Sequence, residues 1–204
     1  MTIIALEGPS YAGKTTVLQT LRAIPALSKA VFFDCYVKSI LHPESIPEAR
    51  TGSTAEQLTA FAVFMGIEAQ RVTAVTRRPA APVILLDRSV DTLMAHARAL
   101  DELAGYTAYP AALRHLQQLP HLRPDLTIYL DASPESLHLR RKHAGHTTTE
   151  PHYFLHDDDF LSLARSYFLN GKQPVITRRL EVVSADQPPE DVAQAVTDLV
   201  LNRR

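Results

Sequence analysis

An octapeptide near the start of the chain has the residue types and the spacing of a phosphate-binding loop. Residues 8–15 read Gly-Pro-Ser-Tyr-Ala-Gly-Lys-Thr, which fits the pattern G-x-x-x-x-G-K-S/T. The glycines let backbone N–H groups turn toward phosphate oxygens, and the N-terminus of a following helix adds partial positive charge. Lys14 would reach the β- and γ-phosphates of ATP, and the Thr15 hydroxyl would hold Mg²⁺. The residues expected to bind ATP are Gly8, Ser10, Tyr11, Ala12, Gly13, Lys14, Thr15 and Thr16.

A second charged group, Asp87-Arg88-Ser89, directly follows the apolar run of residues 82–86. Open α/β sheets bind their ligands at the carboxyl ends of the strands. A carboxylate there can hold Mg²⁺ or its waters, and an arginine can neutralise charge on a phosphoryl group in transfer. We therefore predict that Asp87 is a metal ligand and that both Asp87 and Arg88 are catalytic. A surface ion pair at a strand end is the alternative.

A third basic group, Arg140-Arg141-Lys142, begins a stretch without hydrophobic periodicity, residues 140–150. This stretch lies between two expected helices, so we predict a small lid. Closure of such a lid would exclude water and bring Arg140 and Arg141 to the transferring phosphoryl group. A solvated helix end is the alternative, because the helix dipole also favours basic residues there.

Apolar runs and helical patterns alternate along the chain, as expected for a parallel sheet covered on both faces. The predicted strands are residues 2–7, 30–35, 82–86, 125–130 and 180–183. The predicted helices are residues 14–24, 53 to just before Pro79, 134–141, about 157–168 and 188–201. Ser53 and Glu56 have the spacing of a capping box. We predict one α/β domain, residues 1–204, with a five-stranded parallel sheet, helices on both faces and the small lid.

Composition excludes several classes of protein. Lys and Arg number 21 against 22 Asp and Glu, and the formal charge of −1 argues against nucleic-acid binding. The single cysteine, Cys35, excludes internal disulfides and fits a reducing cytosol. No apolar run approaches the ~20 residues of a membrane span, and residues 1–6 lead into a strand rather than a signal peptide. We expect a cytoplasmic protein that binds neither nucleic acid nor membrane, and a homodimer stays open.

These segments, in this order, resemble the thymidylate kinases and their relatives, the deoxynucleoside kinases, over nearly the whole length. The resemblance rests on LEGPSYAGKTT, LLDRS, YLDASPESLHLRR, DDDFLSLARSYF and VVSADQPPEDV. It implies a three-layer P-loop kinase fold that uses ATP and Mg²⁺. It also implies that Arg140 and Arg141 are lid arginines, and that Ala185 and Asp186 lie in the loop that touches the donor adenine.

The resemblance also implies which residues bind the phosphoryl acceptor. GIEAQR, residues 66–71, is similar to the helix segment that holds the thymine base in this family, which maps base recognition onto Ile67 and Arg71, with Gln70 adjacent. Thymidylate kinases usually have an Arg-Glu-Pro-Gly-like stretch after the second strand, whose arginine grips the acceptor phosphate. Here residues 34–38 read Asp-Cys-Tyr-Val-Lys.

Deoxynucleoside kinases instead carry at this point a carboxylate that takes the proton of the acceptor 5′-hydroxyl. The resemblance therefore implies that Asp34 is the general base, since a hydroxyl acceptor benefits from one and a phosphate does not. Tyr36, Lys38 and Arg88 would contact the acceptor. The alternative is a strand-end Asp that caps a turn.

We therefore expect a phosphotransferase that moves the γ-phosphoryl group of ATP to a small nucleoside-like acceptor, with a hydroxyl acceptor favoured. The alternatives are a thymidylate or other nucleoside monophosphate kinase, a kinase of a hydroxyl-bearing natural product, and a non-enzymatic nucleotide switch. GTPase switches usually contain Asn-Lys-x-Asp, a tetrapeptide that does not occur in this sequence.

Overall fold

A computed structural model of the chain describes residues 1–40, 45–47, 51–78, 80–146, 157–170 and 176–202. Its centre is a five-stranded sheet in the order β2-β3-β1-β4-β5, in which every neighbouring pair is parallel. The strands are β1 (Thr2–Glu7), β2 (Val31–Phe33), β3 (Val83–Asp87), β4 (Leu126–Asp131) and β5 (Leu180–Ser184). The predicted α/β fold with a five-stranded parallel sheet is confirmed.

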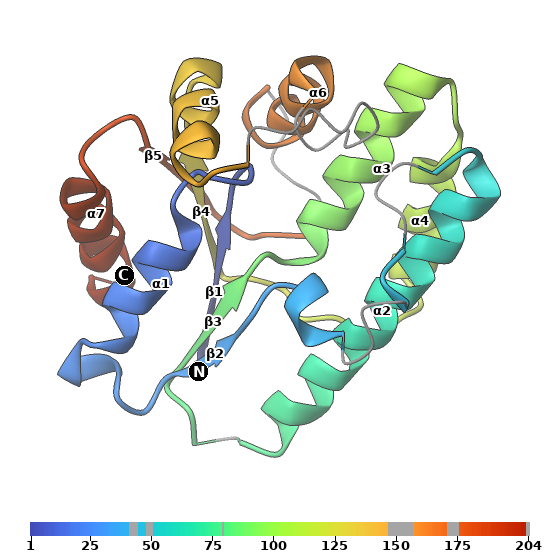
Figure 1. The fold of residues 1–204 in the computed structure, drawn as a ribbon. Helices are drawn as coiled ribbons and strands as arrows, with labels where there is room; N and C mark the ends of the chain where they lie inside the picture. The colour runs from blue at the N-terminus through green and yellow to red at the C-terminus, as the bar shows by residue number, and fades with distance from the viewer. Residues whose placement is uncertain (41–44, 48–50, 79, 147–156, 171–175, 203–204) are drawn as a thin grey trace.

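Helices cover both faces of this sheet. They are α1 (Lys14–Arg22), α2 (Thr54–Thr76), α3 (Val90–Ala104), α4 (Ala108–Leu116), α5 (Pro134–His143), α6 (Asp158–Leu169) and α7 (Pro189–Leu201), with 3₁₀ turns η1 (Pro25–Leu27) and η2 (Val37–Ser39). Helices α1 and α7 pack together on one face, whereas α2, α3 and α4 lie on the other (Figure 1). Helix α6 packs against α3.

The central strands are apolar along their whole length because both of their faces are buried. Ile4 and Leu6 of β1 belong to the hydrophobic cluster with α1 and α7. Ala5 and Ile84 point to the other face and pack in a cluster with Val75 of α2. Since all strands are parallel, their carboxyl ends meet at one edge of the sheet, and the loops that follow them can form one site.

Helix α2 begins with the capping contacts predicted for it. The Ser53 hydroxyl accepts a hydrogen bond from Glu56 N at 3.2 Å, and the Glu56 carboxylate accepts one from Gly52 N at 2.7 Å. By length and composition alone α2 could cross a membrane, a test that core helices of soluble proteins also pass. In this fold its side chains Phe61 and Met65 are buried in the core.

Two helices between β3 and β4, α3 and α4, were not predicted from the sequence. Ser89 caps the start of α3 by accepting a hydrogen bond from Asp91 N, and Gly105 ends the helix with a φ of 69°. The carboxylate of Asp101 then caps α4, because it accepts hydrogen bonds from Ala108 N at 2.8 Å and Tyr109 N at 2.9 Å.

Helix α5 extends further than predicted. It continues to His143, so the first four residues of the predicted lid, 140–143, form its last turn. Residues 147–150 of the predicted lid lie outside the described part of the chain. Closure of this segment stays a prediction.

Candidate active site

The loop between β1 and α1 turns sharply over the end of β4. Gly8, Tyr11 and Gly13 have positive φ angles of 130°, 67° and 97°. A Cβ atom on Gly8 would lie 2.6 Å from the carbonyl oxygen of Leu130, so a side chain there would require the backbone to shift. The loop is therefore pressed against β4, and its backbone leads directly into the N-terminus of α1.

Lys14 is buried at the start of α1, and its ammonium group is bound to the loop itself. Nζ donates hydrogen bonds to Gly8 O at 2.8 Å and to Pro9 O at 2.7 Å. Burial lowers the pKa of Lys14 to about 7, and the positive charge of Arg88 acts in the same direction. Phosphate oxygens are stronger acceptors than these carbonyls, so Lys14 can exchange its loop contacts for contacts with a nucleotide.

We expect nucleotide binding to take up protons above pH 7. A bound triphosphate favours the charged form of Lys14 and raises its pKa, so between about pH 7 and the new pKa each binding event adds a proton. Affinity should therefore fall as pH rises from 7 to 9. Calorimetry at pH 8 in buffers of different ionisation enthalpy measures this uptake. Lys14→Arg, which stays charged, should abolish it, and a wild-type protein that binds ATP without proton uptake would contradict the assignment.

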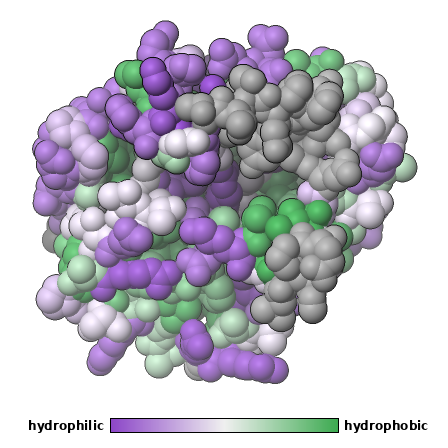
Figure 2. Space-filling model, in the orientation of Figure 1, coloured by the Kyte–Doolittle hydropathy of each residue, from purple (hydrophilic) through white to green (hydrophobic). Residues whose placement is uncertain are grey.

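A pocket of about 590 Å³ lies over the loop. Figure 2 shows a hollow bordered mainly by hydrophilic residues at the position that this loop occupies in Figure 1. The predicted residues that line the pocket are Ser10, Tyr11, Ala12, Gly13, Lys14, Thr15, Thr16, Lys38, Asp87, Arg88, Arg140 and Ala185. Four lining residues were not predicted, namely Val17, Cys35, Pro189 and Val192.

Asp87 and Arg88 stand at the carboxyl end of β3, beside the loop. Asp87 is 5% exposed, and its Oδ1 atom has no hydrogen-bond partner among the described residues. Arg88 has a left-handed backbone with a φ of 69°, and its N–H donates to Leu6 O at 3.1 Å. Carboxylate and hydroxyl oxygens suit Mg²⁺, so Asp87 and Thr15 fit the metal site predicted for them.

Glu7, at the end of β1, is a buried carboxylate that was not predicted as part of the site. It accepts hydrogen bonds from Ser89 N at 2.7 Å, from the Ser89 hydroxyl at 2.9 Å and from the Thr92 hydroxyl. Burial raises the pKa of Glu7. These contacts join the end of β1 to the start of α3. A glutamate between an apolar strand and the first glycine of the loop is the sequence signal that could have found it.

Arg140 connects α5 to the loop and to the end of β5. Its guanidinium donates to Tyr11 O at 3.3 Å and to Ala185 O. The Tyr11 hydroxyl in turn lies 2.9 Å from His146 Nδ1. Arg141 does not line the pocket, and its Nη2 lies 3.2 Å from His138 Nδ1.

Asp186 does not line the pocket but binds Ser133 beside it. Its carboxylate accepts hydrogen bonds from Ser133 N at 2.9 Å and from the Ser133 hydroxyl at 3.1 Å. The first of these lowers the pKa of Asp186 more than any other contact. The carboxylate thus fixes the loop after β5 against the start of α5 and leaves Ala185 as the lining residue of this pair.

Asp34 is turned away from the pocket. Its side chain is 61% exposed and forms an ion pair with Arg22 at 3.3 Å. Cys35 and Lys38 line the pocket instead. At the end of β2 the wall therefore contains a thiol and an ammonium group, and the predicted base does not contribute to it.

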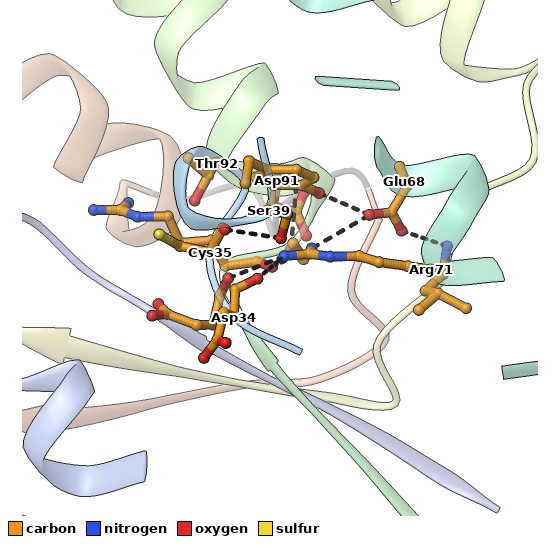
Figure 3. Close-up of polar contacts among 12 residues, drawn as sticks. Asp34, Cys35, Ser39, Glu68, Arg71, Asp91 and Thr92 are labelled. Atoms are coloured by element: carbon orange, nitrogen blue, oxygen red, sulfur yellow. Dashed lines mark hydrogen bonds and ion pairs between the residues drawn. The ribbon is translucent and has the colours of Figure 1, made fainter. Parts of the chain in front are cut away.

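The other predicted acceptor contacts also lie outside the lining of the pocket. Tyr36 is buried and donates a hydrogen bond to Glu68 Oε2 at 2.9 Å. Burial, followed by the negative charge of Glu68, raises the pKa of Tyr36 well above 10. Ile67 is buried in the cluster of α2 and α3, and Gln70 is exposed. Arg71 lies beneath the site on backbone carbonyls (Figure 3).

Together, the sheet order and the loop define the fold of the P-loop kinases. Comparison with family models and with curated protein sequences found no match. Among solved structures, deoxyadenosine kinase from M. mycoides with bound dATP aligns over 98% of this chain and 100% of its own, with a TM-score of 0.66 and 14% identity.

The same kinase with the products dCMP and a flexible dCDP aligns over 98% of this chain and 100% of its own, with a TM-score of 0.62 and 16% identity. With bound dCTP, it covers the same shares with a TM-score of 0.56 and 16% identity. The chain therefore has the deoxynucleoside kinase-like fold that the sequence resemblance implied.

Proposed function

We propose that this chain transfers the γ-phosphoryl group of ATP to a hydroxyl group of a small, nucleoside-like acceptor. The observation that carries the proposal is one pocket lined by Lys14, Asp87 and Arg88 beside the phosphate-binding loop. The likeness in fold to deoxyadenosine kinases, whose structures hold dATP, dCTP and dCMP, supports a nucleotide donor and a nucleoside-like acceptor.

In this reaction the acceptor oxygen forms a bond to the γ-phosphorus, and the bond from that phosphorus to the bridging oxygen of ADP breaks. Loop N–H groups and Lys14 would hold the phosphates. Arg88 and Arg140 would neutralise the charge on the transferring group. The hydroxyl proton would pass to a carboxylate at the pocket wall.

The wall also suits the donor and its metal ion. Thr15 and Asp87 would hold Mg²⁺, which when bound neutralises negative charge on the phosphates. The unpartnered Oδ1 of Asp87 supports this use among the residues that the structure describes. The donor adenine would lie near Ala185 and Val192, which give the pocket an apolar side.

Asp87 is also the carboxylate that we assign to the acceptor proton. The sequence resemblance favoured Asp34 as the proton acceptor. To reach the pocket, the Asp34 side chain would have to break its ion pair with Arg22 and adopt another rotamer. Asp87 is already a lining residue, and two oxygens let one carboxylate serve the metal ion and the proton. Substitution of each aspartate by Asn therefore distinguishes the two assignments.

A monophosphate acceptor is the second candidate, because Lys38 and Arg88 both line the pocket whereas Asp34 does not. An acceptor phosphate needs positive charge and no base. Arg50, another cation that could hold it, lies outside the described residues.

An ADP-formation screen over nucleosides, their 5′-monophosphates and unrelated alcohols tests the proposal. We expect thymidine or another nucleoside to have a higher kcat/KM than its own monophosphate. A clear preference for the monophosphates would support the second candidate, and turnover of alcohols alone would indicate a natural-product kinase. Slow hydrolysis without any acceptor, with nucleotide-dependent binding of a protein, would identify a switch. The cytoplasmic location and a homodimer stay predictions.

We also propose that residues 140–150 close over the bound substrates. Arg140 already lines the pocket and Arg141 does not, and closure would bring both guanidinium groups to the transferring phosphoryl group. Replacing Arg140 and Arg141 by Ala should therefore lower kcat more than ATP affinity. Proteolysis near Gly145 should slow when both substrates are bound. Lys142→Ala, at an exposed position on the same turn, is the matched control. A site near Gly145 that is already protected without ligands would contradict closure.

A further inference from the structure

We infer that Arg71 is a positioning residue that holds the reactive ends of β2 and β3 in place, an inference that rests on the proposed function. Arg71 is 3% exposed on α2, beneath the pocket. Its Nη1 atom donates to Arg88 O at 3.0 Å, and Nη2 donates to Asp34 O and, at 3.5 Å, to Asp87 O. One guanidinium group therefore contacts the backbone at the carboxyl ends of two strands (Figure 3).

These carbonyl groups lie where the sheet stops and its ladder hydrogen bonds end. Arg88 has a φ of 69°, a left-handed conformation that is unfavourable for a non-glycine residue and persists only where surrounding contacts fix it. The hydrogen bond from Arg71 to Arg88 O is such a contact on the side of α2. On the side of β1, Arg88 N donates to Leu6 O. The turn that places the Asp87 and Arg88 side chains at the pocket is thus held on both sides.

The guanidinium is itself fixed by a buried network. Glu68 is fully buried, and its Oε2 atom accepts hydrogen bonds from Arg71 at 3.4 Å and from the Tyr36 hydroxyl at 2.9 Å. The other carboxylate oxygen accepts from Leu122 N at 2.8 Å. The guanidinium carbon also lies 4.1 Å from the centre of the Tyr36 ring. Among the described residues Nε of Arg71 is the one nitrogen atom of this guanidinium without a hydrogen-bond partner, and the contacts of Nη1 and Nη2 fix its position.

This geometry requires an arginine. A planar guanidinium can present separate N–H groups to carbonyls of two strands and to a carboxylate at once, whereas a lysine ammonium cannot span them. The structure therefore assigns Arg71 a role different from the base contact that the sequence resemblance implied. It acts through Asp87 and Arg88, and not through the substrate.

The test compares Arg71→Lys with Arg77→Lys, an exposed arginine at the end of the same helix. We expect Arg71→Lys to lower kcat by ~10–10²-fold, the range for a small misplacement of catalytic groups, with nucleotide affinity changed less than twofold. Arg77→Lys should behave as wild type. A residue needed only for folding would change the urea midpoint without this division between kcat and affinity.

Hydrogen exchange provides a readout that does not depend on turnover. In Arg71→Lys the amides of Arg88 and Ser89 should exchange at least tenfold faster, whereas the amides of α7 should be unchanged. Tyr36→Phe keeps the ring beneath the guanidinium and removes only the hydroxyl that donates to Glu68, so it should shift both readouts in the same direction by a smaller factor. This variant tests the inference if Arg71→Lys does not fold. Wild-type kcat and wild-type exchange in Arg71→Lys would overturn the inference. A wild-type protein without any phosphotransfer would overturn the proposed function alone.

Discussion

Lys14→Ala should fold normally and lose ATP turnover by ~10²-fold or more, the scale of one strong transition-state contact. The ammonium group of Lys14 donates hydrogen bonds to the carbonyls of Gly8 and Pro9, and Lys14 belongs to none of the apolar clusters of the core, so its removal should leave these clusters intact. Burial of this group lowers its pKa to about 7, so the folded protein disfavours the charged form until an anion binds beside it.

The measurement is steady-state ADP formation with a saturating acceptor, beside thermal unfolding of the same sample. Lys29→Ala, which removes an exposed lysine just after η1, is the matched control and should keep wild-type turnover. Unchanged turnover in Lys14→Ala would mean that the loop does not hold the donor phosphates. A large fall in both variants would point instead to a loss of folded protein.

Asp87→Asn should slow phosphotransfer by ~10²–10⁴-fold, the range of a lost proton acceptor or metal ligand, whereas Asp34→Asn should slow it by less than tenfold. Asp87 is 5% exposed, lines the pocket and has an unpartnered Oδ1 among the described residues. Asp34 is 61% exposed and paired with Arg22 across 3.3 Å. An exposed ion pair of this kind contributes little to stability, so Asp34→Asn should stay folded. Oδ1 of Asp87 has no hydrogen bond to lose among the described residues, so Asp87→Asn should also stay folded.

The two variants should be measured with a nucleoside and with its own monophosphate over a range of Mg²⁺ concentrations. A deficit in Asp87→Asn that high Mg²⁺ partly restores would indicate a metal ligand, and one that Mg²⁺ does not change would indicate a base. The reverse ranking, with Asp34→Asn slow and Asp87→Asn near wild type, would show that Asp34 leaves Arg22 and takes the proton itself.

The features predicted correctly from the sequence are those that neighbouring residues determine. The motif of residues 8–15 and the buried runs of β1 and β3 are local patterns, and parallel pairing follows from alternation of strands and helices. Helix α3 was missed although Ser89 and Gly105 mark its ends. Its buried face includes Asp91, Thr92 and three alanines, and these residues do not stand out in a search for large apolar side chains at helical spacing.

The direction of side chains at the end of β2 was beyond sequence reasoning for a physical reason. β2 has three residues, too few for alternation to show whether Asp34 or Cys35 would point to the pocket. The role of Arg71 depends on carbonyl groups of residues that are far apart in the sequence and meet only at the edge of the sheet. A helical arginine gives no sign in the sequence of which backbone atoms it will contact.

The position of β1 in the middle of the sheet affects how this protein can be made. β1 is synthesised before both of its partners, since Thr2 registers with Val83 of β3 and Ile4 with Leu126 of β4. A ribosome adds ~5–20 residues per second, so the nascent strand stays unpaired for seconds with its apolar side chains exposed to chaperones. The loop at Gly8 cannot pack against Leu130 until β4 has emerged from the ribosome. A truncated chain that stops before β4 therefore has no completed pocket, and a ligand of this pocket cannot stabilise it.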